Sequence, residues 1–265
     1  MLYYPQLLSG AVAQFPIARV EAHRTLVNTM PDGSTVRSAD PGFGSARWQL
    51  SYSHLTDAEA GALRELFEAA QGELNSFVFL DPADNLLLWS SDLTNAAWST
   101  DALLRVTGGQ ADPQGGTGAF QLTNTGQAGQ GIRQTIPAPG SLLYCFSLYA
   151  LSAGGTTLTL TASDSAEEAS ITVNPGTGWS RYAFAPMLPG AGELITYSIG
   201  LAPGAQASVF GLQLEAQRAP GIYKPTTDRS GVYPNCRFDG GALRLTATGV
   251  NQNSALVRLV SPIPD

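Results

Sequence analysis

The chain has 265 residues, of which 43% are hydrophobic and 13% are charged, and its formal net charge is −7. This length and apolar content allow a sizeable core in one large or two medium domains. The chain is negatively charged and its only lysine is Lys224, whereas proteins that bind phosphate backbones are rich in lysine and arginine. This excludes nucleic-acid binding as its main role. The 29 glycines and 17 prolines favour turns and short strands.

The chain start and the cysteines predict a protein made in the cytoplasm without export. Residues 1–5 lack the basic start and apolar core of a signal peptide, and no apolar run is long enough to span a bilayer. Cys145 lies in the apolar run LLYCFSLYAL and is expected to be a buried, inert thiol. Its spacing from Cys236 gives no framework for a disulfide.

The first residues predict strands joined by a tight turn. Residues 17–24 and 26–29 read as one strand and its continuation, and 35–37 as the returning strand. Pro-Asp-Gly-Ser at 31–34 is a strong turn signal between them. Residues 40–44, with a proline and two glycines, are expected to form a loop.

Residues 47–82 then predict a strand, a capped helix and a second strand. Trp48, Leu50 and Tyr52 alternate with polar residues, as in a half-buried strand. Thr56 and Glu59 have the spacing of a capping box. The apolar stripe of the helix consists of Leu63, Leu66, Phe67 and Ala70. The helix should end at Gly72 in a left-handed conformation, and the second strand should follow at 76–80.

This segment resembles the N-terminal domain of distal-tail-type minor tail proteins of tailed phages. The resemblance implies a structural subunit that forms a hexameric ring between the tail tube and the hub. It rests on the two strands, the helix and the FxFLDP ending, and covers about a third of the chain. The residues that carry it are Arg47, Trp48, Leu50, Tyr52, Leu55, Thr56, Glu59, Leu63, Phe67, Gly72, Ser76, Phe77, Phe79, Leu80, Asp81 and Pro82.

From Asp84 to about Thr226 the pattern changes to short β-type runs separated by Gly, Pro, Asn and Asp. Roughly eight strands over roughly 140 residues is the size of a jelly-roll sandwich. The expected strands are 118–122, 132–136, 143–150, 156–162, 169–173, 179–185, 194–201 and 208–215.

This second segment resembles the carbohydrate-binding-module-like jelly rolls of phage tail proteins. The resemblance covers residues 85–227 and keeps its landmarks in order. Those landmarks are Asn85 to Leu87, Ser90, Trp98, the DPQGG run at 112–116, IRQTI at 132–136, the run from Tyr144 to Tyr149, GWSRY at 178–182, FGLQLE at 210–215 and YKPT at 223–226.

Residues 228–265 again predict strands, at 236–245 and 251–260, that would be marginal alone. We expect these C-terminal strands to pair with the N-terminal strands and complete their sheet. We therefore expect a mainly β protein. A discontinuous assembly domain, 1–84 plus 228–265, would hold a β-sheet or barrel with one packed helix. Residues 85–227 would be an inserted antiparallel β-sandwich, a jelly roll, because insertion is common where domain ends lie close together.

The sequence offers no strong catalytic constellation. His23 and His54 are the only histidines and no nucleophile-elbow motif accompanies them, so both are expected to serve packing or the surface. Asp164, Glu167 and Glu168 cluster in a loop-like stretch. They are expected to be solvated carboxylates, with the alternatives being a structural Ca²⁺ site or the acids of a polysaccharide depolymerase. We expect a protein that is not an enzyme and that holds no cofactor.

Sugar binding needs aromatic rings and amide groups on one surface. The candidates in the sandwich are Trp98, Trp179, Tyr182, Asn124 and Gln127, although the tryptophans coincide with landmarks that favour a core role. The leading hypothesis is a virion protein of the tail tip or baseplate. Its expected partners are copies of itself, a tail tube protein, a hub protein and host surface polysaccharide, with no membrane insertion. The alternative is a stand-alone glycan-binding protein.

Overall fold

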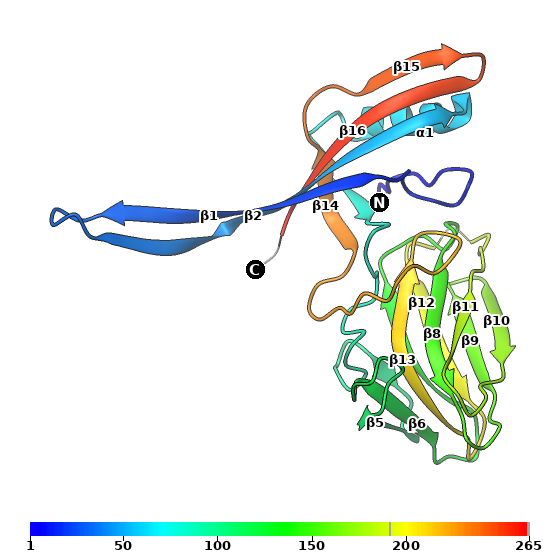
Figure 1. Cartoon of the computed structure of the whole chain (residues 1–265). Coiled ribbons are helices and arrows are strands. Elements are labelled where there is room, and N and C mark those ends of the chain that lie inside the picture. Colours follow the sequence, from blue (N-terminus) through cyan, green and yellow to red (C-terminus); the bar gives the residue numbers. More distant parts are fainter. Residues whose placement is uncertain (191, 264–265) are drawn as a thin grey trace. The chain divides into compact units, whose positions relative to one another are not determined.

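The computed structural model describes residues 1–190 and 192–263, and confirms the predicted mainly β fold (Figure 1). Within these residues the chain has one helix, and no helix is long and apolar enough to cross a membrane. The chain divides into two compact units. Unit 1 comprises Met1–Leu8, Ala13–Phe79 and the chain from Tyr233 onward, and unit 2 comprises Ser9–Val12 and Leu80–Val232.

Unit 1 is built on one antiparallel sheet. Its strands lie in the order β1-β2-β16-β14-β3, and β15 pairs with β16 beside β14. The C-terminal strand β16 therefore lies next to β2, with Leu259 opposite Trp48. The bounds are β1 Ile17–Thr29, β2 Thr35–Leu55, β3 Phe77–Leu80, β14 Val232–Phe238, β15 Arg244–Gly249 and β16 Gln252–Pro262.

The predicted helix and its cap are confirmed. Helix α1 spans Asp57–Ala69. The Glu59 amide donates to Thr56 Oγ1 at 3.2 Å and the Thr56 amide donates to Glu59 Oε2 at 2.8 Å, which closes the capping box. Gly72 has φ +68°, and Gln71 before it is also left-handed at +53°.

The helix covers one face of the sheet and creates the core of unit 1. Leu63 and Leu66 are buried, and the Phe67 ring lies 5.0 Å from that of Phe238 on β14. The buried alternation predicted for Trp48, Leu50 and Tyr52 is confirmed. The opposite face of the sheet carries the exposed residues that alternate with them.

The loop predicted at 40–44 is wrong, because β2 runs without interruption through this stretch. Arg24 pairs with Asp40 and Ala22 with Ser45, so residues 41–44 lie opposite His23 alone. Four residues opposite one form a large irregular bulge in a two-stranded ribbon, where lost ladder hydrogen bonds are tolerated. Beyond this bulge residues 24–40 form a hairpin arm that extends away from the rest of the unit 1 sheet (Figure 1).

Unit 2 is a sandwich of two five-stranded antiparallel sheets, in the orders β10-β9-β12-β7-β4 and β11-β8-β13-β6-β5. Tyr197 on β12 contacts the Tyr144 and Phe146 rings, at 6.3 and 5.3 Å between centroids, so the core lies between the sheets. The bounds are β4 Ser99–Thr100, β5 Leu104–Gln110, β6 Ala119–Asn124, β7 Gln130–Ile136, β8 Cys145–Leu151, β9 Leu158–Ser163, β10 Glu168–Val173, β11 Ser180–Phe184, β12 Ile195–Leu201 and β13 Gln206–Glu215.

Eight of these strands match the expected runs to within a few residues, and β4 and β5 were not predicted. Neither cysteine forms a disulfide within the described residues, and both are buried, which confirms the burial predicted for Cys145. Burial, with a smaller contribution from the Glu215 carboxylate, raises the pKa of the Cys145 thiol to about 11, so it stays protonated at neutral pH.

Candidate functional site

The candidate site is the outer face of the β11-β8-β13-β6-β5 sheet in unit 2. Paired residues share a face, so the register places Tyr149 with Phe210 and Leu151 with Ser208 on this side. Ser208 in turn pairs with Gln121 on β6. The face therefore runs from aromatic residues at one end to polar residues at the other.

The aromatic end consists of three rings. Phe210 lies 6.1 Å from Tyr149 and 5.2 Å from Tyr223, centroid to centroid. They converge over Gly211, whose positive φ of +64° lies in the bulge of β13; an added Cβ would come within 3.2 Å of Tyr223. Phe210 is buried, whereas Tyr149 and Tyr223 are half-buried and keep part of each ring open to solvent.

Polar contacts fix this end of the face. Arg181 lies 5.4 Å from the Tyr149 ring centroid and donates to Ser147 Oγ at 2.9 Å and to the Gly221 carbonyl at 2.5 Å. Burial raises the pKa of Tyr223, which shares a hydrogen bond with Ser90 Oγ at 3.3 Å. These contacts thus hold the two tyrosine rings in place.

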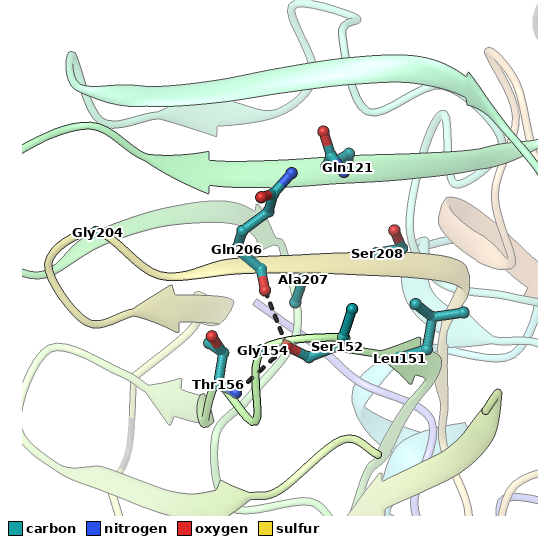
Figure 2. A pocket seen from close by; sticks show the side chains of 10 residues that line it. Gln121, Leu151, Ser152, Gly154, Thr156, Gly204, Gln206, Ala207 and Ser208 are labelled. Atoms are coloured by element: carbon teal, nitrogen blue, oxygen red, sulfur yellow. Dashed lines mark hydrogen bonds between the residues drawn. The ribbon is translucent and has the colours of Figure 1, made fainter. Parts of the chain in front are cut away.

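The polar end is a groove of about 360 Å³ (Figure 2). Gln121 and Gln206 stand on the neighbouring strands β6 and β13, and Ser152 donates to the Gln206 carbonyl at 3.0 Å and accepts from the Thr156 amide at 3.2 Å. The lining side chains carry no charge: Gln121, Leu151, Ser152, Ala153, Thr156, Gln206, Ala207 and Ser208, with Gly154 and Gly204. Amide and hydroxyl groups here can both donate and accept hydrogen bonds.

The structure does not bring the five residues predicted to bind sugar onto this face. Trp98 is 5% exposed and its indole N–H donates to the Trp89 carbonyl. Asn124 is 1% exposed, and its amide donates to the Ala202 carbonyl and two others while its oxygen accepts from Gly126. Both hold loops together inside the sandwich.

The other three predicted residues are more accessible but scattered. Tyr182 is half-buried, pairs with the buried Leu148 and donates to the Asn174 carbonyl at 3.1 Å. Gln127 is exposed in the β6–β7 connection, and Trp179 is half-buried just before β11. Sequence reasoning missed Tyr149, Gln121 and Gln206. Alternation along the predicted strand 118–122 separates Gln121 from the apolar Phe120 and Leu122, whereas Tyr149 lies in an apolar run and Gln206 precedes the strand predicted at 208–215.

The carboxylates and histidines considered for catalysis do not form a site. Asp164 Oδ1 accepts the Ala166 and Glu167 amides at 2.8 Å each, and these bonds lower the pKa of Asp164 below its usual value. Glu167 is exposed beside it. Across residues 1–190 and 192–263, no group of three or more His, Cys, Asp or Glu side chains is placed to hold a metal ion. His23 and His54 are both exposed in unit 1.

No family model matches the chain, and no curated protein matches it. Among solved structures it is similar to the tailspike protein 4 enzymatically active domain of bacteriophage CBA120, at 15% identity and a TM-score of 0.39, over 51% of this chain and 21% of that one. It is also similar to the CBM22-1 xylan-binding domain of Paenibacillus barcinonensis Xyn10C, at 14% identity and a TM-score of 0.41, over 52% and 96%. A family 22 module of Clostridium thermocellum Xyn10B matches at 16% identity and a TM-score of 0.39, over 51% and 94%.

Proposed function

We propose that this chain is a structural subunit of the tail tip of a tailed phage or phage-derived particle. Unit 1 assembles with neighbouring subunits and unit 2 contacts neutral host glycans. The observation that carries the assembly role is the arm at 24–40. Within residues 1–190 and 192–263 its two strands pair only with each other, because β16 accompanies β2 no further than Ser45. A two-stranded ribbon is marginal in water unless one of its faces is covered.

The side chains of the arm indicate what covers it. Leu26, Val27, Met30 and Val36 are 44–48% exposed, and both faces of the ribbon carry apolar groups, because Leu26 pairs with Ser38 and Val27 with Arg37. Exposed strand edges with apolar side chains are ready-made pairing sites, which free monomers normally avoid. The arm is therefore suited to lie against a neighbouring protein.

The rest of the assignment follows from the resemblance of residues 47–82. The proposed partners are copies of this chain in a hexameric ring, a tail tube protein and a hub protein. The proposed location is the tail tip of the virion, after synthesis in the host cytoplasm. The role is geometric, since identical heterologous contacts close a ring, and no catalysis is assigned to the chain.

Removal of the arm tests the assembly role. Asp40 pairs with Arg24, so residues 25–39 can be replaced by Asn-Gly, which closes the ribbon with a two-residue turn. We expect the intact chain to form a discrete oligomer in light scattering and the shortened chain to dissociate. The assembly role is wrong if the intact chain stays monomeric at high concentration.

The glycan-contacting role rests on the outer face of unit 2. Half-exposed tyrosine rings can stack on the apolar face of a sugar, and the adjoining Gln121 and Gln206 can bond its hydroxyls. Because the groove lining is uncharged, the ligand class is a neutral glycan. Affinity electrophoresis against neutral polysaccharides should show retardation that is lost in the Gln121→Ala/Gln206→Ala variant.

A matched control is Thr161→Ala/Ser198→Ala, which alters paired residues of the other sheet. The glycan role would be refuted if the site variant and the control variant lost retardation equally, or if no neutral polysaccharide retarded the intact chain. Glycan binding by a chain that is always monomeric would instead favour the alternative of a stand-alone glycan-binding protein.

A further inference from the structure

Helix α1 covers one face of the unit 1 sheet, and among the described residues of unit 1 no other element covers the opposite face. On β2 the side chains of Arg47, Gln49 and Ser51, which alternate with the buried Trp48, Leu50 and Tyr52, are all exposed. On β16 Arg258 is exposed between the half-buried Leu256 and Val260. This face therefore combines exposed arginines with half-buried leucine and valine side chains, a mixture that a partner protein can contact.

Three arginines form a straight line across this face. Arg244 on β15 pairs with Leu256, Arg258 lies two residues further along β16, and Arg47 on β2 pairs with Val260. Each step is a diagonal between neighbouring strands of about 7–8 Å, so the line is about 15 Å long. We name Arg244, Arg258 and Arg47 the arginine line.

The arginine line is only partly neutralised within its own chain. Arg47 Nη1 lies 3.3 Å from Asp239 Oδ2, and the Arg47 side chain remains 56% exposed. Arg244 and Arg258 are exposed, and among the described residues neither makes an ion pair or a side-chain hydrogen bond. Arg237, next to the line, donates to the carbonyls of Glu73 and Leu74. A line of guanidinium groups of this kind favours a carboxylate partner.

The outward face of α1 offers such carboxylates. Asp57, Glu65 and Glu68 are exposed and fall within one quadrant of the helix, with a single base, Arg64, at its edge. Asp57 Oδ1 also accepts a hydrogen bond from Asn253 Nδ2 at 2.8 Å within the chain. From Asp57 to Glu68 the helix rises about 16 Å, at about 1.5 Å per residue. The acidic stripe therefore matches the arginine line in length and opposes it in charge.

Gly61 gives an independent indication that something approaches this side of the helix. It lies mid-helix on the same side as Glu65 and Glu68, and a Cβ built there would meet nothing within 4 Å. Glycine at such a position costs about 1 kcal/mol relative to alanine, and no contact among the described residues requires it. With Ala58 and Ala69 also exposed, the helix surface is low enough for a sheet to come close.

We propose that the outward face of α1 of one subunit docks on the arginine line of a second copy of this chain. The acidic stripe lies along the diagonal of the sheet, and Gly61 allows the helix backbone to approach Leu256 and Val260. This docking contact rests on the proposed function in one respect, namely that the chain associates with itself. It adds which two surfaces make the contact. The two surfaces lie on opposite sides of unit 1, so the contact is heterologous and propagates from subunit to subunit, in a ring or in an open filament.

Charge reversal in the full-length chain tests the contact. Glu65→Arg/Glu68→Arg should raise the subunit dissociation constant at least about tenfold in sedimentation velocity, as should Arg244→Glu/Arg258→Glu. Mixing the two reversed chains should restore association, because every contact in an alternating assembly then joins opposite charges. All four changes in one chain should likewise restore association to within about threefold of the original. Glu167→Arg/Glu168→Arg, which makes the same charge change on exposed residues of unit 2, should leave association unchanged.

Gly61→Leu separates folding from docking. Leucine favours the helix, so the melting temperature of unit 1 should not fall, while the added side chain should block association. The proposal is overturned if the variant with all four charge changes does not recover association, or if the Gly61→Leu variant associates normally. If in either case the chain still forms an oligomer that is lost when the arm is removed, the proposed assembly role remains valid. A chain that never associates would overturn both.

Discussion

Asn85 provides the sharpest test of how unit 2 is held together. Its side chain is fully buried, and its amide nitrogen donates to the carbonyls of Leu212 and Lys224, at 3.0 and 3.1 Å. Its amide oxygen accepts from the backbone N–H groups of Leu87 and Leu214, at 3.1 and 3.0 Å. One side chain thus joins the start of unit 2, strand β13 and the segment that leaves the sandwich.

We predict that Asn85→Ala destabilises unit 2 by about 4 kcal/mol. The substitution removes one partner from each of four buried backbone groups, and a buried group left unsatisfied costs about 1–3 kcal/mol, part of which relaxation and water recover. For a unit of this size each kcal/mol lowers the melting temperature by about 2–4 °C, so the expected shift is about 10 °C.

Differential scanning calorimetry of the full chain measures this shift. The two units should give separable transitions, and only that of unit 2 should move, because all the groups that bind Asn85 lie in unit 2. The control is Asn174→Ala, at an exposed asparagine of the same unit. A shift of less than about 2 °C, or an equal shift in the unit 1 transition, would refute the reasoning.

Three further predictions follow from contacts elsewhere in the chain. Thr56→Ala should lower the stability of unit 1 by about 1 kcal/mol in calorimetry, because it opens the capping box, and an unchanged transition would contradict this. Burial alone would raise the pKa of Glu59, but bonds donated by Thr56 and Leu8 outweigh it and lower that pKa below 4.5. The Glu59 carboxylate therefore stabilises unit 1 fully above about pH 4.5, and this contribution is lost as the pH falls through the lower pKa that Glu59 has in the folded state. Glu59→Gln should consequently reduce the difference between the unit 1 melting temperatures at pH 7 and pH 3. Tyr149→Ala should abolish polysaccharide retardation without loss of the unit 2 transition, and retention of retardation would remove that ring from the site.

Much of the fold could be predicted because local signals agreed with each other. Thr56 and Glu59 mark the helix start by a spacing that only a cap explains, and the alternation of Trp48, Leu50 and Tyr52 fixes which side of β2 is buried. The stretch at 40–44 misled the prediction because proline and glycine mark loops and bulges alike. Strand β5 was missed because its Thr-Gly-Gly segment at 107–109 resembles a turn.

The candidate site was harder to predict than the fold. Trp98 and Asn124 have the chemistry of sugar ligands, yet both are buried, where they satisfy backbone groups. Tyr149 lies in an apolar run that predicts a core strand, and only the strand register shows that it faces away from Phe146 and the core. The arginine line depends on β15, β16 and β2 lying side by side, which a single sequence does not reveal.

Electron microscopy of the concentrated full-length chain tests the central claim most directly. The account predicts closed rings of uniform size, which disappear when residues 25–39 are replaced by Asn-Gly. Open filaments would keep the heterologous contact but contradict the ring. Isolated monomers at every concentration would contradict the assembly role itself.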